Sequence, residues 1–301
     1  MRSSTSPRSF LQKLLQSQPP LPFEPALLPM LFAVTNEKSR ASTNDLVTLI
    51  ERSQKLASRV LTIANSAAYG MEYKVSSLDQ AVRILGIREI RLLVVLIGMA
   101  ALTQGTKLPN SFNLTELWKH QLKTAAIAKA LVTALGGPAG RCGPSAGEES
   151  RLAMDPDTAY AAGLLHDIGK VFFAVGDPDR WREVEEVWEK GALKYFEIEN
   201  NLFGMDHAFI GAGILHHWRL PLLLTEPINW HHEPELAQAY KMDARLVAAA
   251  DHIAHSEADT EGNLCAEAAS LLPHGYDPAQ LKSAVAKSIA DTTAETLLAF
   301  V

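Results

Sequence analysis

The sequence contains very little cysteine and no long apolar run. Its only two cysteines, Cys142 and Cys265, lie far apart and outside any CxxC pair. This argues against a disulfide scaffold and predicts reduced thiols in a cytosolic protein. The most apolar stretch, residues 92–103, is too short to cross a bilayer and predicts a buried helix. No apolar segment follows the serine-rich residues 1–10, so we expect no secretory signal and no membrane contact.

The chain also lacks an excess of positive charge. Its formal net charge is −6 and its isoelectric point is about 5.9. It therefore has none of the basic character of a protein that coats nucleic acid. Hydrophobic residues make up 47% and charged residues 21% of the 301 residues, as in ordinary globular proteins. That length accommodates one large domain or two modest ones with a buried core.

Histidine is missing from the first part of the chain. No histidine precedes His120, and the composition changes near residues 101–112. We therefore expect a tail over residues 1–17 and an N-terminal helical lobe without a metal site over residues 18–105. A second helical lobe, over residues 106–301, could hold a metal.

Apolar residues recur every three or four positions in almost every long segment, and no segment alternates cleanly with period two. This pattern predicts an all-α fold. The polar residues 42–45 indicate the start of a helix over residues 46–64. A glycine- and proline-rich loop is expected over residues 136–157. Further helices are expected over residues 77–85, 88–101, 117–135, 158–175 with a break at Gly169, 180–190, 193–202, 206–218, 221–230, 242–255 and 277–298.

Histidine and aspartate side chains recur within or beside these apolar helix patterns. Burying a bare charge costs several kcal/mol, so such groups need partners, and a shared metal ion would supply one. Imidazole and carboxylate ligands together suit iron, manganese, zinc or magnesium better than a soft metal. The candidate ligands are His120, His166, Asp167, His207, His231, His232 and Asp251.

An alternative without metal exists for each of these residues. A His-Asp pair arises often by chance, and a lone His120 or His207 is more often a hydrogen-bonded core residue than a ligand. It is the order and spacing of the whole set that favour one site over several coincidences. The remaining histidines are predicted not to be ligands: His216, His217, His252, His255 and His274.

Residues 159–170, AYAAGLLHDIGK, resemble the core of the HD superfamily. Further stretches resemble its HDOD branch in the expected order over roughly residues 18–255. In the C-terminal half these are WKH at 118–120, Glu199 with GMDH at 204–207, WRLP at 218–221 and INWHH at 228–232. In the N-terminal half they are PPLP at 19–22, LTIANSAAYG at 61–70 and LDQAVRILGI at 78–87.

The resemblance implies a multi-helix, HD-like bundle with an N-terminal helical lobe, in a bacterial, cytoplasmic protein of signal transduction. It adds Glu199 to the ligands, and if the protein is a phosphohydrolase, Asp167 would bridge metal ions. Lys170 would sit near a substrate phosphate. One or two divalent ions are implied, iron or manganese ahead of zinc, nickel or magnesium. The expected partner is a signalling protein or a nucleotide-like ligand.

Two features depart from the related sequences. Residues 52–54 read RSQ where the family often has Asp-Pro, and no Gly-Tyr-Pro tripeptide follows His232. The second departure argues against hydrolysis of cyclic-di-GMP. No receiver, GGDEF or EAL stretch is present in these residues, so we expect a standalone protein.

Three hypotheses about function remain open. The first is a regulatory module that binds a ligand or partner without turnover. The second is a metal-dependent phosphohydrolase acting on a nucleotide or phosphate ester. In it the metal would activate water, and Asp167 and Lys170 would serve catalysis. The third is a metal-free interaction module whose histidines are hydrogen-bonded core residues.

Overall fold

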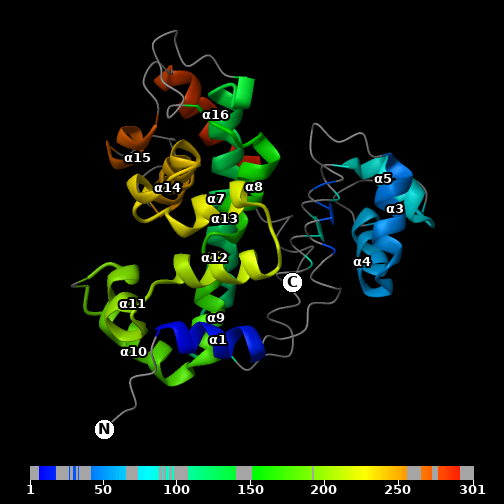
Figure 1. Cartoon of the computed structure of the whole chain (residues 1–301). Helices are drawn as coiled ribbons and strands as arrows, with labels where there is room; N and C mark the ends of the chain where they lie inside the picture. The colour runs from blue at the N-terminus through cyan, green and yellow to red at the C-terminus, as the bar shows by residue number, and fades with distance from the viewer. Residues whose placement is uncertain are drawn as a thin grey trace. The chain divides into compact units, whose positions relative to one another are not determined.

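The computed structural model describes residues 7–17, 42–65, 74–87, 108–139, 151–191, 193–255, 266–272 and 277–291, with isolated residues between 27 and 33 and between 90 and 97. These residues contain helices and no strand, which confirms the predicted all-α fold (Figure 1). No described helix has both the length and the apolar character needed to cross a membrane. The predicted helix over residues 88–101 lies largely outside the described residues.

The chain folds into two compact units. The larger unit comprises Met1–Gln18, Lys107–His216 and Leu222–Thr292, and the smaller one comprises Pro19–Thr106, His217–Pro221 and Thr293–Val301. The helix α1 (Pro7–Ser17) lies in the stretch predicted to be a tail, and it belongs to the larger unit.

The smaller unit contains α3 (Thr43–Glu51), α4 (Gln54–Ala64) and α5 (Leu78–Leu85), which contact one another. Ser42 caps α3 in a capping box with Asp45, as the polar cluster predicted. The single helix expected over residues 46–64 is divided, because the Ser53 side chain accepts a hydrogen bond from the Leu56 amide and starts a new helix.

In the larger unit the long helix α7 (Leu114–Ala134) packs against α8 (Pro156–Leu165), α14 (Lys241–His255) and α16 (Pro278–Asp291). Its side chains Leu122, Ile127 and Leu131 are almost fully buried. Burial of this apolar face against three helices stabilises the unit. The helix α15 (Ala266–Leu271) contacts α14.

The remaining helices continue the larger unit: α9 (Ile168–Gly176), α10 (Pro178–Trp188), α11 (Tyr195–Phe203), α12 (His207–His217) and α13 (Leu222–Asn229). Short 3₁₀ turns lie at Gly137–Ala139 and Pro234–Leu236.

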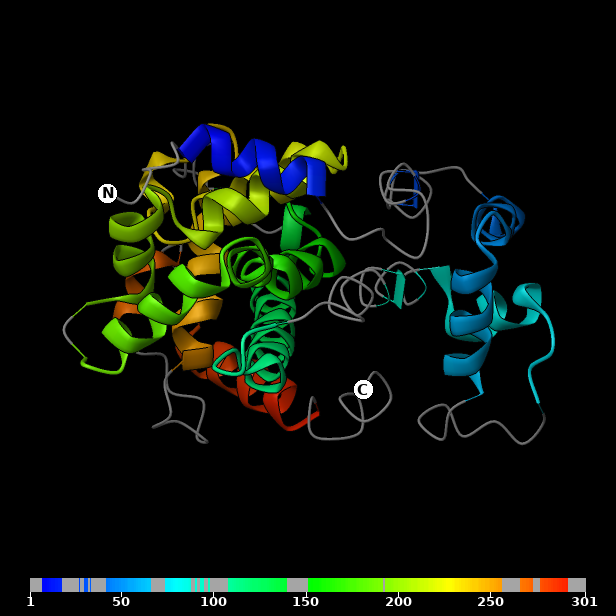
Figure 2. The same ribbon diagram turned by 90° about the horizontal axis from the view of Figure 1, so that it is seen from below.

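Helix α1 lies at the surface of the larger unit in both views (Figures 1 and 2). The Phe10 ring contacts the rings of Phe173 and Phe203, with centroids 5.8 Å and 5.4 Å apart. Phe10 and Leu14 are buried, each 4% exposed. The amphipathic pattern of this helix therefore fixes it to α9 and α11.

Candidate metal centre

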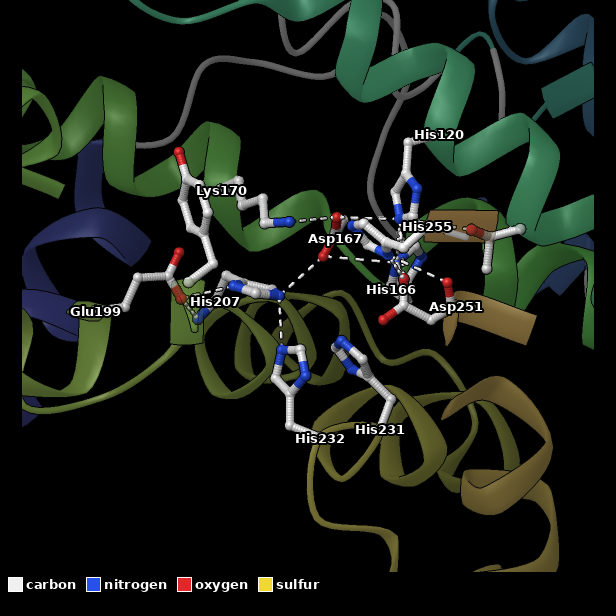
Figure 3. Close-up of polar contacts among 12 residues, drawn as sticks. His120, His166, Asp167, Lys170, Glu199, His207, His231, His232, Asp251 and His255 are labelled. Carbon is white, nitrogen blue, oxygen red and sulfur yellow. Dashed lines mark hydrogen bonds and ion pairs between the residues drawn. The ribbon is translucent and has the colours of Figure 1, made fainter. Parts of the chain in front are cut away.

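The predicted ligands come from separate elements of the larger unit and meet at one place (Figure 3). His120 comes from α7, and the pair His166 and Asp167 joins α8 to α9. His207 begins α12, and Asp251 lies on α14. The last two ligands, His231 and His232, follow α13.

The helix expected over residues 158–175 breaks at His166 and Asp167, ahead of the predicted break at Gly169. Gly169 instead allows α9 to pack closely on α12. A Cβ atom added there would lie 2.0 Å from the carbonyl oxygen of His207. Only glycine allows the two backbones to approach this closely, and the approach brings Asp167 beside His207.

Asp167 stands between the two halves of the cluster. Its Oδ1 atom lies 2.8 Å from His207 Nε2, and its Oδ2 atom lies 2.6 Å from Lys170 Nζ. His120 Nε2 lies 3.6 Å from Oδ2. The carboxylate is 2% exposed. One carboxylate with oxygens directed to both halves has the geometry of a bridging ligand.

One half of the cluster is formed around Asp251. His120 Nε2 lies 3.0 Å and His166 Nε2 lies 3.4 Å from Asp251 Oδ1. The two imidazole Nε2 atoms are 3.2 Å apart. In the other half, His232 Nε2 lies 2.9 Å from His207 Nε2, and His231 adds its ring at 3.9 Å from that of His232, measured between centroids.

Three of the histidine rings are oriented by an acceptor at Nδ1. His166 Nδ1 lies 2.7 Å from the Gly163 carbonyl oxygen, and His231 Nδ1 lies 2.7 Å from that of Ile228. Each contact favours the tautomer with the proton on Nδ1, which leaves a lone pair on Nε2. Such contacts are typical of histidines that bind metal.

Glu199 orients the third ring, that of His207. Its Oε2 atom lies 2.6 Å from His207 Nδ1, and it also accepts a hydrogen bond of 2.8 Å from the backbone amide of His207. The sequence placed Glu199 among the ligands, whereas this contact puts it behind His207. Its other oxygen, Oε1, is buried and has no hydrogen-bond partner among the described residues.

The arrangement fits a divalent ion. Two ligand atoms about 2.1 Å from one ion and at right angles to each other lie about 3.0 Å apart. The Nε2 pairs of His120 with His166 and of His207 with His232 are 3.2 Å and 2.9 Å apart. His231 Nε2 is buried and has no hydrogen-bond partner among the described residues, which an ion would provide.

Burial keeps several of these imidazoles neutral. It lowers the pKa of His120 to about 4 and that of His231 to about 3. Burial, together with His231 and His207, also lowers the pKa of His232 well below its usual value. Neutral imidazoles at pH 7 are ready to bind a metal ion without first losing a proton.

The groups around Asp167 behave differently. Burial alone would lower the pKa of His207, but Glu199 and Asp167 outweigh it and raise that pKa to about 10. Burial would raise the pKa of Asp167, but His166, Lys170 and His207 hold it well below its usual value. Asp167 is therefore an anion, and His207 carries a proton that a bound ion would replace.

Lys170 lies at the edge of the cluster. Its Nζ atom lies 5.2 Å from the centroid of the Tyr195 ring. The Tyr195 hydroxyl donates a hydrogen bond of 2.5 Å to Glu185 Oε1. Burial would lower the pKa of Lys170, but Asp167 and Glu199 raise it. The ammonium group therefore remains charged beside Asp167 and offers a cation to an anionic ligand.

The structure also places His255 beside the centre, although the sequence predicted that it is not a ligand. His255 Nδ1 lies 3.0 Å from Asp251 Oδ1, and its ring centroid lies 4.1 Å from that of His120. The spacing of four residues from Asp251 on one helix was the available signal, because such residues share a face. The sequence did not indicate that Tyr195 and Phe196 lie beside the centre, because neither residue belongs to a recognisable motif.

The HDOD domain family model matches residues 21–234 of this chain. An HDOD domain protein of unknown function from Geobacter sulfurreducens shares its fold with a TM-score of 0.70 and 23% identity, over 94% of this chain and 96% of its own. A "Putative phosphohydrolase" from Shewanella amazonensis SB2B has a TM-score of 0.69 and 24% identity, over 95% and 98%. A "Putative signal transduction protein" from Marinobacter aquaeolei VT8 has a TM-score of 0.71 and 21% identity, over 97% and 65%.

A curated relative from Treponema pallidum (strain Nichols), described as an uncharacterized protein, is 27% identical over 216 residues. The match spans 71% of this chain and 38% of that protein, so the chain spans well under half of the relative's length. These three likenesses to solved structures are below 25% identity and establish the shared fold alone.

Proposed function

Because the chain belongs to the HDOD domain family, we propose that it is a regulatory protein of the bacterial cytoplasm with a metal centre in its larger unit. The centre holds one or two divalent transition-metal ions, iron or manganese ahead of zinc, nickel or magnesium. The protein acts by binding a signalling partner or a nucleotide-like ligand at this centre.

One observation carries the proposal. The Nε2 atoms of His166, His207 and His231 face the cluster, and each ring has its Nδ1 atom beside a carbonyl or carboxylate acceptor. Core histidines that serve only packing would not need this common orientation. With Asp167 and Asp251 they form a set of imidazole and carboxylate donors, which suits transition metals.

A specific contact favours hydrolysis as a second candidate function. Lys170 Nζ lies 2.6 Å from Asp167 Oδ2 at the edge of the cluster. There the ammonium group would bind a phosphate oxygen and offset charge that develops during cleavage of a phosphate ester. A divalent ion bound nearby would supply a Lewis acid and activate water at neutral pH. Asp167 would hold both this cation and the ion in place.

Metal analysis of the full-length protein, purified without oxygen, tests the centre. We expect close to one or two equivalents of iron or manganese. The variant His207→Ala should lose at least one ion, and His216→Ala, an exposed histidine of the same helix, should lose none. Less than about a tenth of an equivalent in the wild type would contradict the centre and leave the metal-free interaction module.

Turnover assays on the metal-loaded protein separate regulation from hydrolysis. A panel of nucleotides and phosphate esters should release no phosphate or mononucleotide if the protein only binds its ligand. Release that disappears in Asp167→Ala would establish the phosphohydrolase. Release that is equal in the variant comes from a contaminant and leaves the regulatory function in place.

A further inference from the structure

The N-terminal half of α11 faces the metal centre with three side chains. Glu199 lies four positions after Tyr195 and three positions after Phe196, which brings it to the same side of the helix as each of them. Tyr195 lies beside Lys170, and Glu199 orients His207. The third member, Phe196, stacks on the ring of His232. Each of the three therefore contacts a different functional group of the centre.

His232 differs from His166, His207 and His231 in how its ring is held. The rings of His166, His207 and His231 each have an acceptor at Nδ1. Among the described residues, the only hydrogen-bond contact of the His232 ring is the one from Nε2 to His207, 2.9 Å long. No carbonyl or carboxylate oxygen among them orients its Nδ1 atom.

The stack on Phe196 provides the missing orientation. The two ring centroids are 4.5 Å apart and the ring planes are inclined by 16°. Rotation of the imidazole about its Cβ–Cγ bond would drive its edge into the phenyl face, so the stack restricts that rotation. The planes of His207 and His232 are at 89° to each other, and the His232 Nε2 atom is held towards His207.

We propose that Phe196 is a positioning residue that fixes the His232 ring for metal binding. Through Phe196 and Glu199, helix α11 sets the affinity of the half of the centre formed by His207, His231 and His232. This inference rests on the proposed metal centre. In the described part of the chain, the rings of the half around Asp251 are held by α8 and α14, so the effect of α11 falls on one ion.

Titration of the metal-depleted full-length protein with Mn²⁺ tests the inference. Loss of one outer-shell contact typically weakens metal binding by about 10–100-fold. We expect Phe196→Leu to weaken the binding of one ion by that factor and to leave the other unchanged. Phe196→Tyr keeps the ring and should bind both ions as the wild type does. In a His207→Ala background, Phe196→Leu should add no further loss.

A matched control removes an aromatic contact elsewhere. Phe112 is partly buried and pairs with Trp181, their ring centroids 5.3 Å apart. Phe112→Leu should therefore lose packing and leave both Mn²⁺ affinities unchanged. Equal affinities in Phe196→Leu and the wild type would overturn the inference while the metal centre stands. Equal weakening in Phe196→Leu and Phe112→Leu would also overturn it, because the effect would then be general packing.

A measurement without metal decides the role of Phe196 even if the protein binds no ion. Histidine ring nitrogens and carbons can be observed by NMR in the metal-free protein. We expect the His232 ring signals to shift and broaden in Phe196→Leu, because the ring current is lost and the ring samples several rotamers. Unchanged His232 signals in that variant would overturn the inference whatever the metal content.

Discussion

Asp167 shows how much one residue depends on its surroundings. Its carboxylate is almost fully buried, yet His166, Lys170 and His207 keep its pKa low. A buried anion of this kind is maintained only by nearby cations or metal ions. The chemistry proposed for the centre thus rests on contacts that the His-Asp pair does not contain by itself.

Asp243 is a second buried carboxylate with a different role. It is 1% exposed, and its Oδ1 atom accepts hydrogen bonds from the amides of Ala153 and Met154. Burial nevertheless raises its pKa from 3.8 to about 6. A pKa raised in the folded state means that the ionised form is disfavoured there. This residue's contribution to the free energy of unfolding therefore falls as the pH rises through the window from about 4 to about 6.

The variant Asp243→Asn should lack this pH dependence because it cannot ionise. Between pH 4.5 and pH 7, we expect the free energy of unfolding of the wild type to fall by about 1–3 kcal/mol relative to that of the variant. This is the size expected for a shift of one to two pKa units. Urea unfolding at the two pH values measures the difference. Asp79→Asn, at an exposed ion pair with Arg83, is the control. The prediction would be refuted if the free energy of unfolding changed equally with pH in the wild type and in Asp243→Asn.

At the scale of elements, the approach of α9 to α12 is set by Gly169. A Cβ atom at this position would overlap the His207 carbonyl oxygen at 2.0 Å. We expect Gly169→Ala to reduce the free energy of unfolding by about 1–3 kcal/mol, as overpacking does. It should also weaken metal binding, because His207 would be displaced from Asp167. Denaturant unfolding and metal titration measure the two effects.

Gly213 on α12 offers the matched control for Gly169. A Cβ atom there would meet Leu11 side-chain carbons at 3.5 Å and 3.6 Å, which is ordinary contact. Gly213→Ala should therefore leave metal binding unchanged. It should raise the free energy of unfolding by up to about 1 kcal/mol, since alanine favours the helix. A Gly169→Ala protein as stable as Gly213→Ala would show that α9 and α12 can separate without cost.

Helix α1 is a further element whose packing has a measurable consequence. Phe10 is 4% exposed and lies against the rings of Phe173 and Phe203, which stack on each other. Phe10→Ala should cost about 3–5 kcal/mol in the free energy of unfolding of the larger unit, the usual cost of truncating a buried phenylalanine. Thermal unfolding measures it. A change below about 1 kcal/mol would mean that α1 is detached in solution.

For the molecule as a whole, the candidate metal ligands all lie in the larger unit. A metal ion that binds only the folded state stabilises it, by about 2.7 kcal/mol at one hundred times the dissociation constant. We expect Mn²⁺ at that ratio to raise the Tm of the larger unit by about 5–10 °C, given the sensitivity typical of this size. Differential scanning calorimetry, with His207→Ala as the control, measures the shift. An equal shift in the variant would place the ion elsewhere.

Much of this organisation was accessible from the sequence. The helical period of the apolar residues predicted the all-α fold, because the spacing of side chains along a helix is a local property. The residues 42–45 predicted the start of α3 for the same reason, as a cap bonds only to its own first turn. Capping by Ser53 and the break at His166 were missed, because a short polar interruption in an apolar pattern does not by itself end a helix.

The sequence by itself determined which donors are present in the larger unit, since imidazoles and carboxylates in apolar helices must find partners when buried. Only the tertiary structure decided how they pair. It placed Glu199 behind His207, added His255 beside Asp251 and set Phe196 against His232. These contacts join residues from different helices or different turns, and their geometry depends on how closely the backbones approach. Gly169 permits that approach between α9 and α12.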